Sequence, residues 1–262
     1  MNKLLVLYVF HIYNDRVKHF IEHCIFYDQH VDFIIISNDK TIPFKAPDYV
    51  KIMRRDNIGY DFGGWSDALL TDNLYEGYDN FIFVNSSVMG PFLPSKYKGK
   101  WTDLYINGLQ HNVKLFGSTI NTCRQPLTKS HVQSYIFAMD KLTLKYLMTC
   151  EIFSVENYAK TFNEAILKKE VLMSRKIIEH NWNIGSLLPY YKNIDFTFKS
   201  KKPNECNIQF LDDVMFIEYL NKLWNINELV FIKGNRMQTR LRDPNKVRVK
   251  KPLNRFSLNY NS

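Results

Sequence analysis

Residues 4–10 form an unbroken apolar run, which predicts a strand covered on both faces of a sheet. From Val17 onward apolar residues recur at the spacing of one helix face, and Asn14 or Asp15 stands where the helix cap belongs. Residues 33–37 form a second apolar strand. A strand, a helix and a strand in this order predict a βαβ unit with parallel strands and a right-handed crossover.

The same patterns predict elements along the rest of the chain. We expect further strands at 49–53, 81–84, 114–117 and 135–138, and helices at 64–71, 155–181 and 212–224. The sequence contains no internal repeat, no low-complexity segment, and no evident linker before about residue 233. We therefore expect one Rossmann-like α/β domain over residues 1–232, with a mostly parallel central sheet flanked by helices, and a C-terminal extension over 233–262.

Charge gives that extension a character of its own. The chain of 262 residues carries 35 Lys and Arg against 26 Asp and Glu, a formal net charge of +9. Nine basic residues and a single acid, Asp243, lie between Lys233 and Ser262, so nearly all of the excess belongs to this segment. Its candidate roles are contact with nucleic acid, contact with an anionic membrane surface, and a solvated arm or oligomer contact. The extension lacks a stacking platform, with Phe256 and Tyr260 as its only aromatic residues, and no nucleic-acid fold signature precedes it, so a peripheral membrane contact is preferred to nucleic acid.

Cysteine use and hydropathy predict a cytoplasmic protein. The four cysteines show neither a C-x-x-C pair nor a zinc-like spacing, which favours reduced thiols. No apolar stretch reaches the roughly 18 residues that a membrane-spanning helix needs. The apolar start could imitate a signal peptide, but polar residues follow it directly and no small-residue cleavage site appears, which favours a buried strand.

In open α/β sheets ligands bind beyond the carboxyl ends of the strands, so the polar residues that end each strand are candidates for a site. The first strand is followed by His11 and a polar turn instead of G-x-G-x-x-G, and no G-x-x-x-x-G-K-[ST] occurs in the chain. These observations argue against classical NAD binding and P-loop hydrolysis.

Residues 54–65, RRDNIGYDFGGW, combine three glycines with two arginines, one asparagine and two acids. Glycines at 59, 63 and 64 allow positive φ or a close approach of the backbone. An ordinary glycine-rich turn with solvated charges would contain the same glycines, so they do not define a site by themselves.

This segment and the strand after it resemble a known family. The pattern R-x-N-x-G-x-D-F-G-G, then a helix, then E-G-Y-D-x-F-x-F-V-N-S-S-V-M-G-P-F is similar to the rhamnan synthesis protein F group of glycosyltransferases, and more distantly to GT-A nucleotide-sugar transferases. Weaker matching blocks follow in order at 117–121, 131–134, 182–188 and 228–236. The resemblance implies a GT-A-like domain that binds a nucleotide-diphosphate sugar, with rhamnose as a candidate, across the first half of the sheet.

The resemblance also implies where this donor lies. The base and ribose would lie near the ends of the first two strands, and the ribose and diphosphate beside the glycine-rich turn. The implied donor-binding residues are Phe10, Asn14, Ser37, Asn38, Arg55, Asn57, Gly59, Asp61, Gly64, Asn85, Ser86, Ser87, Lys233 and Arg236. For Lys233 and Arg236, the alternative is that they only begin the basic tail.

Residues 85–87 depart from the family pattern. They are Asn-Ser-Ser at the position where GT-A enzymes usually carry Asp-x-Asp. A carboxylate pair there holds Mg²⁺ or Mn²⁺ against the diphosphate, and neutral side chains are poor substitutes. Either a metal uses another acid, such as Asp61 or the pair at 212–213, or the cations Lys233 and Arg236 stabilise the leaving group. Metal dependence therefore stays open.

An inverting transferase also needs a base that deprotonates the acceptor hydroxyl. The resemblance implies an acid pair that opens a helix, and here that pair reads Lys169-Glu170, so Glu170 is the candidate base and half of the pair is lost. The alternative for Glu170 is one more solvated helix glutamate. His131, Gln133 and Trp182 are candidate acceptor-binding residues, with structural or surface roles as their alternative.

We therefore predict a glycosyltransferase, inverting by resemblance, that transfers a sugar from a nucleotide-diphosphate donor to a hydroxyl of a glycan or lipid-linked acceptor. The first rival is a domain that binds a nucleotide sugar or glycan without catalysis, which the neutral 85–87 segment and the lost acid suggest. The second rival is a nucleic-acid-binding protein that uses the tail. The oligomeric state stays open.

Overall fold

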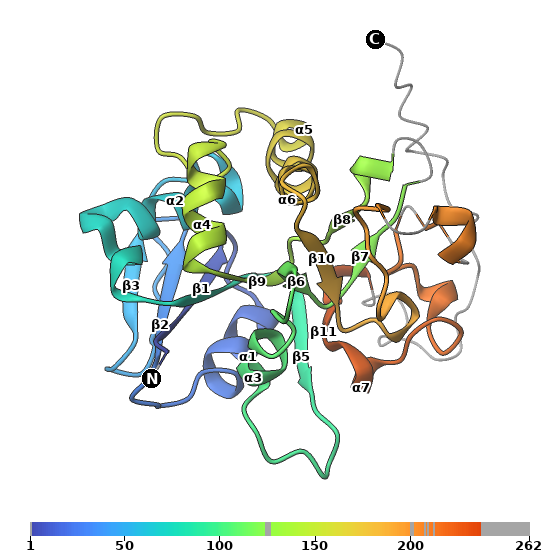
Figure 1. The fold of residues 1–262 in the computed structure, drawn as a ribbon. Helices are drawn as coiled ribbons and strands as arrows, with labels where there is room; N and C mark the ends of the chain where they lie inside the picture. Colours follow the sequence, from blue (N-terminus) through green and yellow to red (C-terminus); the bar gives the residue numbers. More distant parts are fainter. Residues whose placement is uncertain are drawn as a thin grey trace.

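The computed structural model describes residues 2–123, 127–199, 202–206, 208, 210–211 and 213–236. In this part of the chain a seven-stranded sheet has the strand order β10-β6-β9-β4-β1-β2-β3 (Figure 1). Its strands are β1 (Leu4–Phe10), β2 (Val31–Ser37), β3 (Lys51–Arg54), β4 (Asn80–Asn85), β6 (Val113–Gly117), β9 (Ile136–Asp140) and β10 (Asn183–Ser186). All of them run in one direction except β9, which is antiparallel to its neighbours β4 and β6.

β1 lies inside the sheet because its apolar side chains have no face that favours water. Every residue from Leu4 to Phe10 is buried. The strand pairs in parallel with β2, with Leu4 opposite Val31 and Phe10 opposite Ser37, and with β4 on its other side. A continuous apolar run of this kind is typical of parallel strands that helices cover on both faces.

Helices cover the two faces of the sheet (Figure 1). One face carries α1 (Asp15–His23) and α3 (Trp101–Ile106); the other carries α2 (Tyr60–Leu70), α4 (Lys141–Thr149) and α6 (Leu172–Glu179). The helix that ends in α6 begins as α5 (Phe162–Glu164) and passes through a π-helical segment, Ala165–Val171. Short 3₁₀ turns occupy Thr71–Gly77, Leu127–Lys129, Pro189–Tyr191, Pro203–Cys206, Ile217–Tyr219 and Gly234–Arg236.

Aromatic side chains fill both interfaces between sheet and helices. On one face the ring of Tyr8 stacks on Phe20 of α1, with 3.9 Å between the centroids. On the other, Trp65 of α2 packs edge-on against Phe83 and Phe137, at 5.5 and 5.4 Å. All five side chains are buried, so the aromatic content of the sequence serves the core first.

Two small sheets stand beside the large one. β5 (Val88–Phe92) pairs antiparallel with β11 (Val230–Lys233), which follows α7 (Ile226–Leu229), and β7 (Ile120–Asn121) pairs with β8 (His131–Val132). Gly90 permits the first pairing, because a Cβ there would lie 2.4 Å from the carbonyl oxygen of Val230. The pairing places Lys233 opposite Val88, close to the end of β4.

The structure confirms the βαβ unit and the mostly parallel sheet, and it corrects two predicted helices. The helix expected at 155–181 begins only at Phe162, where the Thr161 hydroxyl accepts a hydrogen bond from the Glu164 amide at 3.2 Å. The helix expected at 212–224 is wrong for its described residues. There the Val214 amide donates to the Asn121 side chain and the Trp224 indole donates to the Val214 carbonyl, so tertiary hydrogen bonds replace the helical ones.

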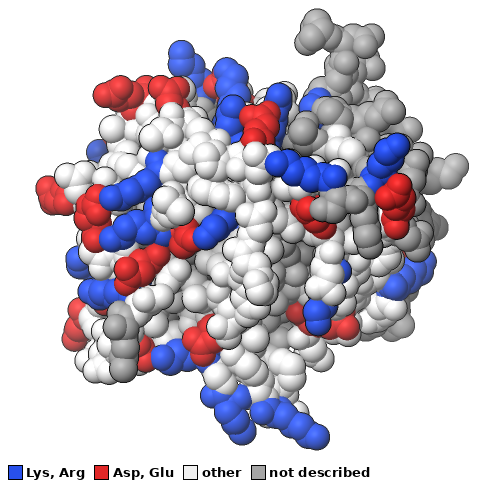
Figure 2. All heavy atoms as spheres, viewed as in Figure 1, with Lys and Arg blue, Asp and Glu red and all other residues white. Residues whose placement is uncertain are grey.

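The face of the molecule in Figure 2 carries basic and acidic side chains interspersed, in agreement with the small net charge of the residues before 233. The basic extension lies outside the described residues beyond Arg236. No helix that the structure describes is long and apolar enough to cross a membrane.

Candidate functional site

The carboxyl ends of β1, β2, β3 and β4 meet at one edge of the sheet, and backbone hydrogen bonds continue from strand to strand there. The Asn38 amide donates to the Phe10 carbonyl at 2.7 Å, and the Arg55 amide donates to the Ser37 carbonyl at 2.9 Å. The loops after the strands therefore start from fixed positions. This carboxyl edge is where a ligand is expected in an open α/β sheet.

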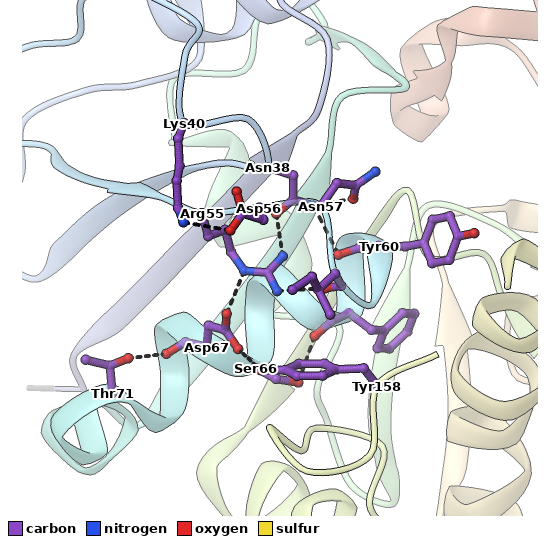
Figure 3. Close-up of polar contacts among 12 residues, drawn as sticks. Asn38, Lys40, Arg55, Asp56, Asn57, Tyr60, Ser66, Asp67, Thr71 and Tyr158 are labelled. Carbon is purple, nitrogen blue, oxygen red and sulfur yellow. Dashed lines mark hydrogen bonds and ion pairs between the residues drawn. The ribbon is translucent and has the colours of Figure 1, made fainter. Parts of the chain in front are cut away.

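Arg55 holds the turn between β3 and α2 together (Figure 3). Its Nη1 donates to Asn38 Oδ1 at 2.7 Å and its Nη2 to the Ile58 carbonyl at 2.7 Å. Its Nε donates to the Asp67 carboxylate at 2.6 Å. Only 8% of the residue is exposed, so this guanidinium acts mainly on the protein itself. We name Asn38, Arg55 and Asp67 the Arg55 cluster.

A loop from the far side of the domain completes the cluster. The Tyr158 hydroxyl donates to the second oxygen of Asp67 at 2.5 Å, and its ring lies 6.0 Å from the Arg55 guanidinium. Burial, and then the neighbouring Asp67 carboxylate, raise the pKa of Tyr158 to about 12. The phenol therefore stays protonated at neutral pH and can keep donating this hydrogen bond.

The glycines of the turn are required by its geometry. Gly59 caps α2 with φ +76°, and a Cβ there would meet the Tyr158 ring at 2.7 Å. A Cβ on Gly64 would lie 2.9 Å from a methyl group of Val9 and 3.0 Å from Asn38 Oδ1. These residues let α2 pack directly onto the ends of β1 and β2.

Asp61 and Asn85 join α2 to the end of β4. Asn85 Nδ2 donates to Asp61 Oδ2 at 3.0 Å, and Asn85 Oδ1 accepts from the Ser87 amide and hydroxyl at 3.0 and 2.6 Å. Desolvation raises the pKa of Asp61 to about 6, opposed by the Asn85 hydrogen bond; the charge of Glu170 raises it further, and those of Lys233 and His11 lower it. The charges that act on Asp61 therefore come from several elements of the fold.

The π-helical segment carries Lys169 and Glu170 in different directions. Lys169 is buried, and its ammonium donates to the carbonyls of Glu151 and Asn157 at 2.5 and 2.7 Å. Burial lowers the pKa of Lys169. Glu170 Oε1 accepts the Ser134 amide at 2.7 Å, at the start of β9 on the carboxyl edge. The predicted base therefore lies on the same edge as Asp61.

Of the two predicted cations, only Lys233 lies free at this edge. The residue is partly exposed, and its ammonium has no ion-pair partner among the residues that the structure describes. Arg236 instead pairs with Asp213 at 3.0 Å. The turn before β5 is fixed by its backbone, because Arg16 Nε donates to the Ser86 carbonyl at 3.1 Å and the Gly234 amide donates to the Ser87 carbonyl at 2.7 Å.

Several other predicted donor residues have structural roles at the same edge. Phe10 is fully buried, and Asn14 caps α1 by accepting the Arg16 and Val17 amides. Ser37 donates its hydroxyl to the Asp39 carbonyl at 2.7 Å. The Asn57 side chain accepts from Asn38 at 3.3 Å. These contacts place the residues beside the candidate site and fix the loops around it.

The structure separates the predicted acceptor residues. Gln133 is buried and contacts Thr119 and Asp213, and His131 contacts the Lys129 carbonyl at 2.7 Å. Trp182 precedes the amino end of β10 and packs on Tyr146 and His180, so it lies at the opposite edge of the sheet. Trp182 and Glu170 therefore lie toward opposite edges of the sheet, because the helix that carries Glu170 runs across it.

The side chains at the Asp-x-Asp position do not fit a divalent cation. Asn85 points its nitrogen toward Asp61 and fills its oxygen with two donors from Ser87. The Asp213 carboxylate is engaged by the Met215 amide and Arg236, and residue 212 lies outside the described residues. Within the described ranges, no three His, Cys, Asp or Glu side chains gather as a metal site requires.

Sequence reasoning missed the partners that fix the turn. Asp67 is separated from Arg55 by 12 residues and Tyr158 by far more, so no local spacing indicates the contact. The sequence pattern marks Lys169 only as the position of a missing acid, whereas in the structure its ammonium holds the loop that contains Glu151 and Asn157. A lysine at an otherwise apolar helical position was the available signal.

Comparison with known proteins gives the family. The family model for rhamnan synthesis protein F matches residues 34–204, from β2 through β10. Over 91 residues the chain is 33% identical to virulence protein VirA of Vibrio anguillarum. The aligned stretch is 34% of this chain and 25% of that protein, so the chain matches about a quarter of that relative's length. A solved cytidylyltransferase structure from Leptospira borgpetersenii aligns over 92% of this chain and 94% of that chain, with 11% identity and a TM-score of 0.38. Because the family model covers more than half of the sequence, the chain belongs to the rhamnan synthesis protein F family.

Proposed function

We propose that the chain is a GT-A-like glycosyltransferase of polysaccharide synthesis, which moves a sugar from a nucleotide-diphosphate donor to a hydroxyl of a glycan or lipid-linked acceptor. One observation carries the proposal: two carboxylates, Glu170 and Asp61, lie at the carboxyl edge of the sheet, held by the Ser134 amide and by Asn85. Lys233, whose ammonium has no ion-pair partner among the described residues, lies on β11 opposite Val88, just after the end of β4. Membership of the rhamnan synthesis protein F family supports the same class of reaction and keeps rhamnose as a candidate sugar.

The proposed roles follow from charge. The acceptor oxygen attacks the anomeric carbon, the bond from that carbon to the diphosphate oxygen breaks, and the diphosphate leaves with the electron pair. Lys233 is the cation available to stabilise that growing negative charge. Glu170 takes the acceptor proton. The Ser134 amide holds Oε1, and no hydrogen bond to Oε2 is formed within the described part of the chain, so Oε2 is available to the acceptor.

The Arg55 cluster positions the donor side of the site. It fixes the loop after β2 and the start of α2, the elements beside which the ribose and diphosphate are proposed to lie. Because the guanidinium is spent on protein contacts, Arg55 is a positioning residue for the donor.

The test is transfer and hydrolysis by the full chain over a panel of nucleotide-diphosphate sugars, with and without Mn²⁺, together with thermal shift. A donor that binds raises the unfolding temperature by mass action. Glu170→Gln should retain this shift and lose at least about a hundredfold in turnover. Glu179→Gln, on the same helix but paired with Arg175 away from the carboxyl edge, is the matched control and should leave turnover unchanged.

A second candidate is a domain that binds nucleotide sugars without turnover. Two observations favour it: Asn85 is neutral where related enzymes carry an acid, and Lys169 replaces the first carboxylate of the helix acid pair. Donor-induced thermal shift without transfer or hydrolysis under any metal condition would select this candidate and contradict the enzyme.

A further inference from the structure

Two aromatic side chains stand beside the candidate site and have no part in the roles above. The rings of Tyr60, at the start of α2, and Phe162, at the start of α5, contact edge to face with 6.2 Å between their centroids. Phe162 is 65% exposed, and Tyr60 is partly exposed. An apolar ring left this open gains little from folding, because most of its surface stays in water.

Tyr60 is held in place by a strained backbone. Its φ is +57°, an unfavourable value for a residue with a bulky side chain. The conformation persists because the Tyr60 carbonyl accepts a hydrogen bond from Asn38 Nδ2 at 3.1 Å, which ties it to the Arg55 cluster. Its ring points away from that cluster (Figure 3). Strain of this kind, imposed by the surrounding structure, is concentrated at functional sites.

Phe162 is fixed by the helix that carries the proposed base. Thr161 caps this helix, and Glu170 follows eight residues after Phe162 on the same helix, as the last residue but one of the π segment. Asp61 is the residue directly after Tyr60. The aromatic pair therefore links the start of α2, which carries Asp61, to the start of the helix that carries Glu170.

We propose that Tyr60 and Phe162 form an aromatic subsite that stacks on the apolar C–H face of a pyranose ring of the acceptor glycan. The chemistry fits because an aromatic face binds the C–H side of a sugar, while the carboxylates of the proposed site can accept hydrogen bonds from the hydroxyls. The acceptor side is assigned because the ring shares a helix with Glu170. This inference rests on the proposed function, since only a transferase requires an acceptor at this place.

A second aromatic pair provides the matched control. Tyr27 and Tyr49 contact edge to face at 5.5 Å and are 76% and 46% exposed. They precede β2 and β3, so they lie at the amino edge of the sheet, away from Glu170. The two pairs share geometry and exposure and differ in position.

The experiment measures binding of methyl α-rhamnopyranoside, methyl α-glucopyranoside and methyl N-acetyl-β-glucosaminide to the full chain by saturation-transfer NMR, and of UDP and dTDP by calorimetry. Phe162→Ala should weaken the glycosides that bind by about fivefold or more and leave nucleotide affinity unchanged. Phe162→Trp should restore glycoside binding, and Tyr27→Ala should have no effect.

Three results would overturn the subsite: no glycoside of the panel binds, Tyr27→Ala weakens binding as much as Phe162→Ala, or Phe162→Ala weakens nucleotides instead, which would assign the ring to the donor base. These readouts do not depend on turnover. Glycoside binding that needs Phe162, in a protein that transfers no sugar, would keep the subsite and contradict only the proposed enzyme.

Discussion

Replacing Arg55 by methionine tests whether the Arg55 cluster stabilises the turn between β3 and α2. The substitution keeps a long side chain in the buried space and removes three hydrogen bonds, to Asp67, Asn38 and the Ile58 carbonyl. It also leaves the Asp67 carboxylate, whose side chain is only 24% exposed, with the Tyr158 hydroxyl as its remaining partner in the cluster. The loss should therefore fall mainly on an anion left without its counter-charge.

The expected magnitude follows from that burial. Removing one partner of a buried ion pair costs about 3–5 kcal/mol, and the partial exposure of Asp67 places this case near the lower limit, at about 3 kcal/mol. A chain of this size changes its Tm by roughly 2–4 °C for each kcal/mol, so Arg55→Met should lower the Tm by roughly 6–12 °C. Urea unfolding followed by tryptophan fluorescence gives the free energy directly, since Trp65 lies buried in the adjoining α2.

Lys40→Met is the matched control. Lys40, in the loop after β2, pairs with Asp56 of the turn between β3 and α2 at the same 2.6 Å separation, but the two side chains are 57% and 61% exposed. An exposed pair contributes about 0–1 kcal/mol, so this variant should unfold within about 4 °C of the wild type. Equal losses in the two variants would refute the reasoning, because burial would then not be what makes Arg55 matter. A double-mutant cycle with Asp67→Asn should give a coupling free energy of about 1–3 kcal/mol.

Three further predictions address the same edge. Gly64→Ala should destabilise the fold by about 1–3 kcal/mol, because its Cβ would collide with Val9 and Asn38. Gly77→Ala, with no atom within 4 Å of the new Cβ, should leave the free energy of unfolding unchanged, and chemical unfolding of both variants measures the difference. The raised pKa of Asp61, about 6, means that the folded state keeps this proton to higher pH than the unfolded chain, so the stability it contributes is fully present below about pH 4 and is lost as pH rises through 6. Unfolding between pH 4 and 7 should show this slope in the wild type and not in D61N. Lys169→Met should speed hydrogen exchange in residues 151–157, because the buried ammonium donates to two carbonyls of this loop. Lys168→Met, at a side chain that is 68% exposed, should leave exchange unchanged. Equal exchange in the two variants would show that Lys169 does not hold the loop.

The sequence predicted the parts of the fold that local patterns determine. β1 and β2 are continuous apolar runs, and their parallel pairing follows from the helix between them. The cap at Asn14 and the conformational need for Gly59 were also readable, because each depends on neighbouring residues only. These features place the ends of the strands, and hence the edge at which the site lies.

The rest depends on contacts between residues far apart in the chain. The spacing of apolar residues at 212–224 fits a helix, yet the Val214 amide bonds to the side chain of Asn121, about ninety positions earlier. Apolar periodicity gives no information about such a distant hydrogen-bond partner. Trp182 is a residue type that can stack on sugars, but it lies at the amino edge of the sheet, because the helix before it crosses from the carboxyl edge. Tyr60 and Phe162 lie in contact because the loop at 150–161 packs on α2, where the Ser154 amide donates to the Ser66 hydroxyl.

The same long-range contacts explain why the acid pair of the resembling family is half lost here. On the π-helical segment, residue 169 points to the carbonyl oxygens of Glu151 and Asn157, while residue 170 points to the Ser134 amide. A carboxylate at 169 would face two carbonyl oxygens and be repelled, whereas an ammonium satisfies both. In the proposed function, the second carboxylate at this edge is Asp61 on α2, which the Asn85 side chain holds at the end of β4. Lysine at 169 therefore fixes the loop over α2 and leaves Glu170 as the carboxylate that this helix offers to the site.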